Sequence, residues 1–173
     1  IGPEVVAKAL TQPDLWTDVE PYVVGSVNVL DKAFALVGSE LRATAVGDTN
    51  SAIPNGRVGV ISPTAEAPLN TLAYGQVSAV AGDAAVCWAR TAGELALGGW
   101  VDAITTAPIS KEAASLAGHA NFGHQEIYQE LASAPRVLTM LVTTGLRVVH
   151  LTTHHPMHTA TTFVTQPGIL EAL

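Results

Sequence analysis

The sequence predicts an α/β fold in which a mostly parallel sheet is covered by helices on both faces. Short apolar runs alternate along the chain with longer segments in which apolar residues recur at helical spacing. This alternation is typical of parallel strands joined by crossover helices. The 173 residues suit a single α/β unit spanning residues 1–173. Because hydrophobic residues make up 48% of the chain and charged residues only 13%, we expect apolar surface that meets another subunit or lobe.

Helix starts and short apolar strands alternate in the first half of the chain. Pro3 and Glu4 suit the first turn of an opening helix that runs to about Leu10. Ser26 follows an apolar run and is typical of a helix N-cap. The elements expected here are, in order, the opening helix, a strand at residues 22–24, a helix from residue 27 to about 37 and a strand at residues 58–61.

The second half begins with the longest predicted helix, from about residue 75 to 97. The residues expected on its inward side are Val77, Val80, Ala81, Ala84, Trp88 and Leu95. Gly98 and Gly99 are expected to end this helix. After it we expect a strand at 101–105, short helices at 111–116 and 124–131, and strands at 137–142 and 146–151 joined at Thr144-Gly145. Residues 137–153 form the most apolar segment, so the last two strands are predicted to be core strands.

Charge and cysteine content argue against several partner classes. A formal net charge of −7 and a pI near 5.2 disfavour nucleic acid and anionic membrane surfaces, both of which attract basic stripes. The single cysteine, Cys87, has no internal disulfide partner and is expected to be a buried apolar residue in a reducing compartment. No uncharged apolar stretch is long enough to span a bilayer. A cytoplasmic protein is therefore predicted.

All six histidines lie within residues 119–158. Histidine suits both the ligation of divalent metals and proton transfer near neutral pH, which indicates that the chemistry lies in this segment. In open α/β sheets, ligands bind beyond the carboxyl ends of strands. Two loops meet that condition, residues 105–111 with Lys111 and residues 152–156 with His154. Local spacing builds no self-contained zinc site, so a metal site would need ligands from distant parts of the chain.

Five segments become specific when they are considered together. In chain order they are Ile1-Gly2-Pro3-Glu4, Gly75-Gln76-Val77-Ser78-Ala79-Val80-Ala81-Gly82, Thr106-Ala107-Pro108-Ile109-Ser110-Lys111-Glu112, Gly123-His124-Gln125-Glu126 and Leu146-Arg147-Val148-Val149-His150-Leu151-Thr152-Thr153-His154. Their order and spacing closely resemble the 4-hydroxythreonine-4-phosphate dehydrogenase family over essentially the whole chain. Within that family, Ala117-Gly118-His119 and His150 are more similar to the branch that acts on D-threonate or D-erythronate 4-phosphate.

The resemblance implies a metal-dependent oxidoreductase that uses NAD or NADP. Family members are two-lobed α/β dehydrogenases, similar to the isocitrate and isopropylmalate enzymes, and they act as homodimers with a shared active site. They oxidise, with decarboxylation, a 4-phosphorylated hydroxy acid such as 4-hydroxythreonine 4-phosphate, a step of pyridoxine and pyridoxal phosphate biosynthesis. A divalent metal (Zn, Mg or Co) would act there as a Lewis acid on the reacting oxygens.

Four residues take roles from the resemblance, position by position. His154 matches a metal ligand, and His124 matches a substrate-contacting histidine. Gln125 stands where the family usually has a substrate-contacting threonine, and its longer amide would alter the pocket wall. Lys111 matches a recurring lysine and is expected to support catalysis near the substrate phosphate or carboxylate. The residues that bind the cofactor stay unassigned.

The resemblance also implies what this chain lacks. The family's other two metal-ligating histidines, and the lysine, asparagine and arginine that grip the substrate, belong to a second half, and a Gly-Asp-Pro start precedes the position of Ile1. We therefore expect a chain truncated at both ends that is inactive by itself. His155 and His158 match no family role and are expected to be exposed. Two alternatives stay open: a non-catalytic truncated lobe that binds a phosphorylated ligand or a partner protein, and a histidine-rich metal-buffering module.

Overall fold

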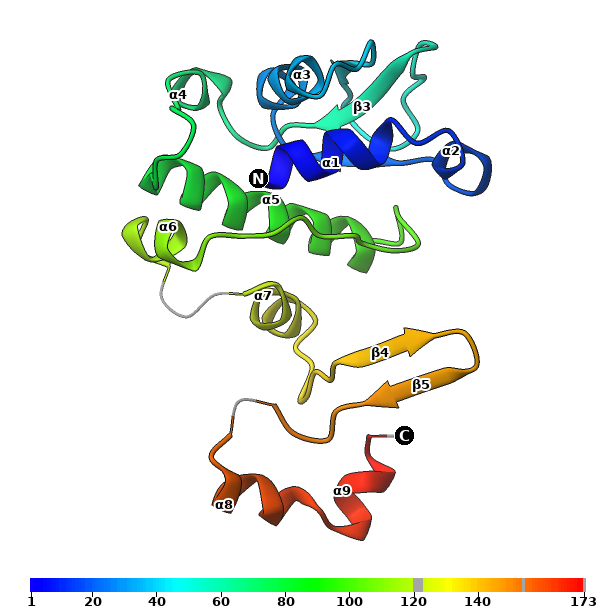
Figure 1. The fold of residues 1–173 in the computed structure, drawn as a ribbon, viewed down its shortest axis with the longest axis vertical. Helices are drawn as coiled ribbons and strands as arrows, with labels where there is room; N and C mark the ends of the chain where they lie inside the picture. The colour runs from blue at the N-terminus through cyan, green and yellow to red at the C-terminus, as the bar shows by residue number, and fades with distance from the viewer. Residues whose placement is uncertain (120–122, 154, 173) are drawn as a thin grey trace. The chain divides into compact units, whose positions relative to one another are not determined.

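The computed structural model describes residues 1–119, 123–153 and 155–172, which form two compact units, Ile1–Ser133 (unit 1) and Ala134–Leu173 (unit 2) (Figure 1). Unit 1 contains α1 (Gly2–Leu10), α2 (Leu15–Asp18), β1 (Tyr22–Val24), α3 (Val27–Leu36), β2 (Arg42–Ala45), β3 (Arg57–Ile61), α4 (Glu66–Leu69), α5 (Ala79–Leu97), α6 (Lys111–Leu116) and α7 (His124–Leu131). Unit 2 contains β4 (Met140–Thr143), β5 (Leu146–Val149), α8 (Met157–Ala160), the 3-10 helix η1 (Thr161–Phe163) and α9 (Gln166–Leu170).

A three-stranded parallel sheet in the order β1-β3-β2 forms the centre of unit 1. Val23 of β1 is in register with Val60 of β3, and Ala43 of β2 with Val58 of β3. This sheet and its helices confirm the α/β class with a parallel sheet. The strands at β1 and β3 were predicted, whereas β2 was missed because its Arg-Ala-Thr-Ala sequence lacks bulky apolar residues.

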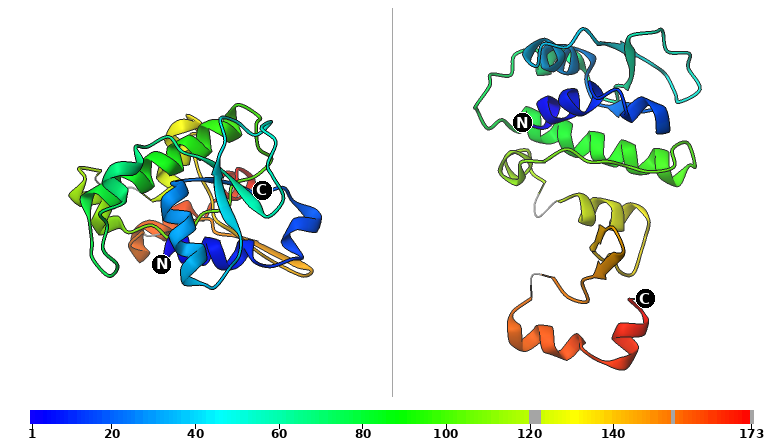
Figure 2. Two further views of the ribbon diagram at one scale, coloured as in Figure 1. Left: turned by 90° about the horizontal axis from the view of Figure 1, so that it is seen from above. Right: turned by 45° about the vertical axis from the view of Figure 1, so that its right-hand side comes forward.

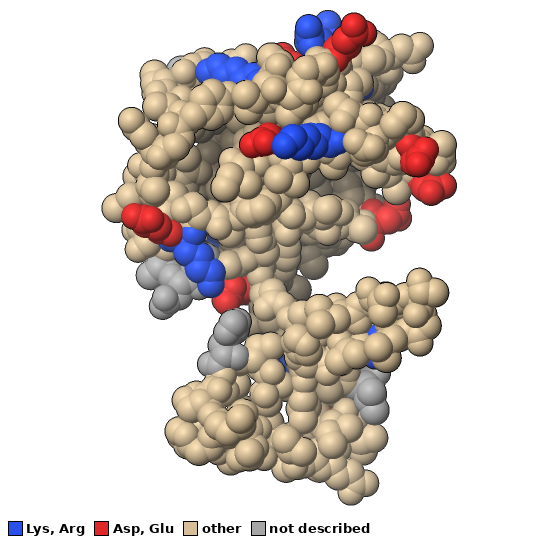
Figure 3. All heavy atoms as spheres, in the orientation of Figure 1, with Lys and Arg blue, Asp and Glu red and all other residues tan. Residues whose placement is uncertain are grey.

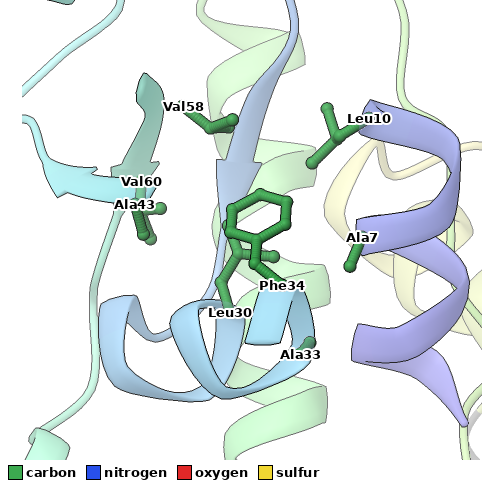
Figure 4. Close-up of a cluster of buried hydrophobic side chains, with 8 residues drawn as sticks. All are labelled: Ala7, Leu10, Leu30, Ala33, Phe34, Ala43, Val58 and Val60. Carbon is green, nitrogen blue, oxygen red and sulfur yellow. The ribbon is translucent and has the colours of Figure 1, made fainter. Parts of the chain in front are cut away.

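The largest buried cluster joins α1 and α3 to the sheet (Figure 4). Phe34 and Leu30 of α3 meet Leu10 of α1 and the strand residues Val58 and Val60. Apolar side chains of this size each stabilise a fold by roughly 1.5–3 kcal/mol when they are fully buried. As predicted, a serine caps α3, because the backbone N–H of the third helical residue donates to the Ser26 hydroxyl at 3.1 Å. The opening helix α1 likewise ends at Leu10 as expected.

The longest helix, α5, begins four residues later than predicted. Gly75 has φ +76°, a left-handed conformation outside any helix, and the Ser78 hydroxyl caps the helix by accepting the N–H of Ala81 at 3.5 Å. The predicted inward side was right in part: Ala84 is buried, and Ala81, Trp88 and Leu95 are half-buried. It was wrong for Val77 and Val80, which are 49% and 43% exposed. The buried residues of α5 are Gly82, Ala84, Val86, Ala89 and Gly93. Small residues therefore line its packed side.

Residues 101–105 do not form the predicted strand. They follow α5 as an irregular extended segment, and among the described residues they pair with no strand. An apolar, β-branched sequence such as Val101 to Thr105 shows only a side-chain preference, whereas a strand also needs a neighbouring edge that accepts its backbone hydrogen bonds. Figure 2 shows this stretch running beside α5 toward α6.

Unit 2 contains the predicted hairpin, in which β4 pairs antiparallel with β5 and Gly145 takes φ +75° in the turn. The prediction of core strands was wrong, because every residue of β4 is exposed and Leu141 and Val142 are 56% and 66% exposed. A two-stranded hairpin buries its faces only when a further layer packs on it. Among the described residues of unit 2, none is buried.

The structure can be compared with the expectations about membrane-spanning helices, the cysteine and the charged residues. Within the part of the chain that the structure describes, no helix is both long and apolar enough to cross a bilayer. Cys87 on α5 is half-buried rather than fully buried, and this burial, with the charge of Asp83, raises the pKa of its thiol. Figure 3 shows basic and acidic side chains interspersed on the visible face of unit 1.

Candidate functional site

Segments that are distant in sequence meet around the start of α6. A Cβ on Gly2 would lie 3.3 Å from the carbonyl oxygen of Pro108 and 3.5 Å from the Cβ of Ala107. The first turn of α1 therefore packs directly on the loop that leads to Lys111. This brings the Ile1-Gly2-Pro3-Glu4 segment against the Thr106–Glu112 segment, two of the five that carry the family resemblance.

At Gly82, α6 packs closely on α5. A Cβ at Gly82 would lie 2.6 Å from the backbone nitrogen of Ala114 and closer still to the carbonyl group of Ala113, so the two helices touch backbone to backbone. Only glycine leaves room for this crossing. Ser110 caps α6 by accepting the N–H of Ala113 at 3.2 Å. Lys111, the first residue of α6, is thus held by its helix while its side chain is exposed.

α7 is anchored on the same helix, farther along. Arg90 of α5 donates to both carboxylate oxygens of Glu130 at 3.0 and 3.1 Å, and a Cβ at Gly93 would lie 3.1 Å from the ring of Tyr128. Ile127 is fully buried in a cluster that joins the three helices α5, α6 and α7. The buried members of that cluster are Val86, Ala89, Ala114 and Ile127.

Lys111 lies beside Gly123, the residue that precedes His124, because α6 and α7 begin beside each other. The Lys111 Cε atom lies 3.6 Å from the position that a Cβ on Gly123 would occupy. Gly123 is buried and is the N-cap of α7, and its N–H donates to the Glu126 carboxylate at 2.9 Å. His124 follows as the first residue of α7. The cationic side chain of Lys111 thus lies near the positive end of α7, where the Glu126 carboxylate already accepts the N–H of Gly123.

The imidazole of His124 is half-buried and lies 6.2 Å, centroid to centroid, from the ring of Tyr128. Burial lowers the pKa of His124 because it disfavours the charged ring, and the negative charge of Glu126 partly offsets that effect. The ring is therefore predominantly neutral near pH 7. A neutral imidazole can donate one hydrogen bond and accept another, which suits contact with a substrate hydroxyl.

The hydroxyl of Tyr128 is buried behind His124 and has no hydrogen-bond partner among the described residues. Burial raises the pKa of Tyr128, so the phenol stays protonated. Gln125 is exposed beside His124 at the start of α7. His119, just past α6, pairs with Asp83 of α5 at 2.9 Å.

Two residues of this site were missed from the sequence. Gly82 ends one of the quoted segments, and a glycine inside an otherwise alanine-rich helix signals close packing. Glu126 stands three residues after Gly123, the spacing by which an acidic side chain reaches back to the N–H of a helix N-cap. Both signals were available before the structure.

The predicted metal ligand, His154, lies outside the described residues, so its role stays a prediction. His155 and His158 are exposed, as expected, and the His155 ring stacks on Phe163 at 5.0 Å. Among the described residues, no group of three or more histidine, cysteine, aspartate or glutamate side chains could hold a metal ion. The described residues alone therefore do not make a metal site, and no chemical step is assigned to one.

Comparison with known proteins shows the family. The model of the family described as pyridoxal phosphate biosynthetic protein PdxA matches residues 17–173. A D-threonate 4-phosphate dehydrogenase from Cupriavidus necator is 38% identical over 99% of this chain and 51% of the relative. A 4-hydroxythreonine-4-phosphate dehydrogenase from Geobacter metallireducens is 35% identical over 100% of this chain and 51% of the relative.

A solved structure extends the likeness to the fold. The crystal structure of a 4-hydroxythreonine-4-phosphate dehydrogenase from Burkholderia phymatum superposes with a TM-score of 0.88 and 34% identity, covering 98% of this chain and 51% of that one. The chain thus spans about half the length of the relatives it matches. On this evidence the chain belongs to the PdxA family of pyridoxal phosphate biosynthetic proteins.

Proposed function

We propose that this chain supplies part of a dehydrogenase that oxidises a 4-phosphorylated hydroxy acid with NAD or NADP, with loss of carbon dioxide. The observation that carries the proposal is that Lys111, at the start of α6, lies beside Gly123, the N-cap residue that precedes His124 in α7. D-threonate 4-phosphate and 4-hydroxythreonine 4-phosphate are candidate substrates, in keeping with the names of the two relatives. D-erythronate 4-phosphate is a third candidate, from the family resemblance of the sequence. All of them carry a phosphate beside a secondary alcohol.

Each site residue has a role that its chemistry supports. The exposed ammonium of Lys111 would pair with the substrate phosphate or carboxylate, since a charge-assisted hydrogen bond to an anion is the strongest polar contact available there. The neutral ring of His124 would hydrogen-bond a substrate hydroxyl. The exposed amide of Gln125, where relatives of this family usually have threonine, would reach farther into the pocket.

The metal and the nicotinamide cofactor belong to the whole enzyme in this proposal. His154 would supply one ligand to a Zn, Mg or Co ion, and a catalytic site needs about three protein ligands. Because the described residues assemble no such group, the other ligands would come from other segments of the active protein. A homodimer with a shared active site is part of the same proposal.

A reduction assay tests the proposal. NADH and NADPH formation is followed with 4-phosphohydroxythreonine, D-threonate 4-phosphate and D-erythronate 4-phosphate, for this chain and for any longer protein that contains it. In parallel, calorimetry measures binding of each phosphorylated acid to wild type, Lys111→Met, His124→Ala and, as a control, the exposed His155→Ala. Lys111→Met is expected to weaken binding by roughly 10–100-fold, since a hydrogen bond to a charged group contributes about 1.5–3 kcal/mol. His124→Ala is expected to weaken it by roughly 2–10-fold, since a hydrogen bond between neutral groups contributes about 0.5–1.5 kcal/mol.

The outcomes separate the alternatives. Reduction of NAD or NADP that requires a phosphorylated acid supports the proposed dehydrogenase. In a protein that shows this activity, His154→Ala should abolish metal-dependent turnover. Binding of the acids without reduction by any protein containing the chain would favour the non-catalytic lobe. If no phosphorylated acid binds, or if Lys111→Met binds as wild type does, the assignment of this site is wrong.

A further inference from the structure

Glu126 lies where α6 and α7 begin, and the proposed function gives it no task. Its Oε2 atom accepts the N–H of Gly123 at 2.9 Å. A Cβ on Gly123 would lie 2.6 Å from that oxygen and 3.6 Å from the Cε atom of Lys111. The carboxylate, the buried backbone of Gly123 and the end of the Lys111 side chain are therefore packed around one point.

The spacing of Lys111 and His124 depends on this point. α6 is anchored on α5 at Gly82, and α7 is anchored separately through Arg90, so the two helix starts are joined locally by the contact at Gly123. Gly123 has an extended backbone (φ −118°, ψ 176°), and its N–H is directed to Glu126 rather than outward. The hydrogen bond to the Glu126 carboxylate thus fixes the backbone conformation of Gly123 at the start of α7.

Charge gives Glu126 a second effect. In the described part of the chain Glu126 and Lys111 form no ion pair, but at longer range the carboxylate, which the helix dipole favours at the start of α7, would attract the exposed ammonium of Lys111. The same negative charge favours the protonated ring of His124, against the effect of burial. The ring of Tyr128 lies next to that of His124 but adds no charge, because burial raises the pKa of Tyr128 and keeps its hydroxyl protonated.

We propose that Glu126 is a positioning residue, whose carboxylate closes the first turn of α7 through Gly123 and holds the side chains of Lys111 and His124 at one substrate-facing point. The inference rests on the proposed function for the tasks of Lys111 and His124. A plain helix cap would need only a hydrogen-bond acceptor at position 126. A positioning residue needs the negative charge as well.

Nuclear magnetic resonance on the 173-residue chain separates these two roles without any substrate. Three variants are compared with wild type: Glu126→Gln, which keeps an acceptor oxygen but loses the charge, Glu126→Ala, which loses both, and Glu112→Gln. Glu112 is the matched control, an exposed carboxylate in the first turn of α6, next to Lys111 in sequence. The readouts are the pKa of the His124 ring, hydrogen exchange of the Gly123 amide, and the nuclear Overhauser contact between the Lys111 Hε and Gly123 Hα protons.

Glu126→Gln is expected to keep the Gly123 amide protected, to lower the pKa of His124 and to weaken the Lys111–Gly123 contact. Glu126→Ala should add the loss of amide protection, and Glu112→Gln should change none of the three. If Glu126→Gln leaves both the pKa of His124 and the contact as in wild type, Glu126 is only a cap and the proposal is wrong. An equal change in Glu112→Gln would also overturn it, since any nearby charge would then suffice. Failure of every phosphorylated acid to bind would refute the proposed function and leave these measurements intact.

Discussion

Replacing Gly82 by alanine is expected to destabilise unit 1 and displace α6, although glycine-to-alanine changes inside helices usually stabilise. The new Cβ would lie 2.6 Å from the backbone nitrogen of Ala114 and closer to the carbonyl of Ala113, whereas ordinary contact begins at 3.4 Å. Backbone atoms of a packed helix cannot rotate aside as a side chain can. α6 must therefore retreat by about 1 Å, and Lys111 moves with it.

Two opposing effects set the magnitude. Alanine gains about 1 kcal/mol over glycine in helix propensity. Overpacking costs typically about 1–3 kcal/mol and more when backbone has to move. Retreat of α6 also loosens Ala114 and Ile127, which are both 0% exposed in the cluster beneath it. We expect overpacking to exceed the propensity gain, for a net loss of about 2 kcal/mol in the free energy of unfolding.

Urea unfolding followed by tryptophan fluorescence and circular dichroism measures this loss in the 173-residue chain. Gly47→Ala is the control, because a Cβ there meets no atom within 4 Å, and its effect should stay within about 0.5 kcal/mol. If Gly82→Ala unfolds at the same or a higher urea concentration than wild type, the inference that α5 and α6 pack backbone to backbone at Gly82 is refuted. In the proposed dehydrogenase, a shift of Lys111 by about 1 Å is expected to lower turnover by up to about 10²-fold.

Two further predictions concern the groups beside Lys111. Burial lowers the pKa of His124 in the folded state, so the unfolded chain binds more protons than the folded chain as the pH falls. The stability that depends on a neutral His124 is complete above the unfolded pKa near 6.5 and is lost as the pH falls through the folded pKa. The urea midpoints at about pH 7.5 and about pH 5.5 should therefore differ less in His124→Gln than in wild type. An identical difference in both chains would contradict this. Because the buried Tyr128 hydroxyl has no partner among the described residues, Tyr128→Phe should raise the free energy of unfolding by about 1 kcal/mol, and a decrease would reveal a hydrogen bond to that hydroxyl.

The predictions that held were those that depend on local chemistry. The helix after Ser26 was predicted because a serine hydroxyl satisfies a backbone N–H of the helix's own first turn, whatever surrounds it. The Ser110 hydroxyl, which was not predicted as a cap, does the same for α6. The start of α5 was missed because Gly75 was included in the helix and the cap at Ser78 was overlooked. The family was also evident from the sequence, since five short segments in the right order are jointly specific.

The sequence by itself determined the α/β class, the starts of α1, α3, α6 and α7, the turn at Gly145 and the family. Tertiary structure decided that residues 101–105 pair with no described strand, that β4 lies exposed, and that the Lys111 side chain lies beside Gly123. The physical reason is the range of the interactions. Caps and turns join groups a few residues apart, whereas a strand partner, a covering layer or a glycine seat such as Gly82 is supplied by residues far away in the sequence.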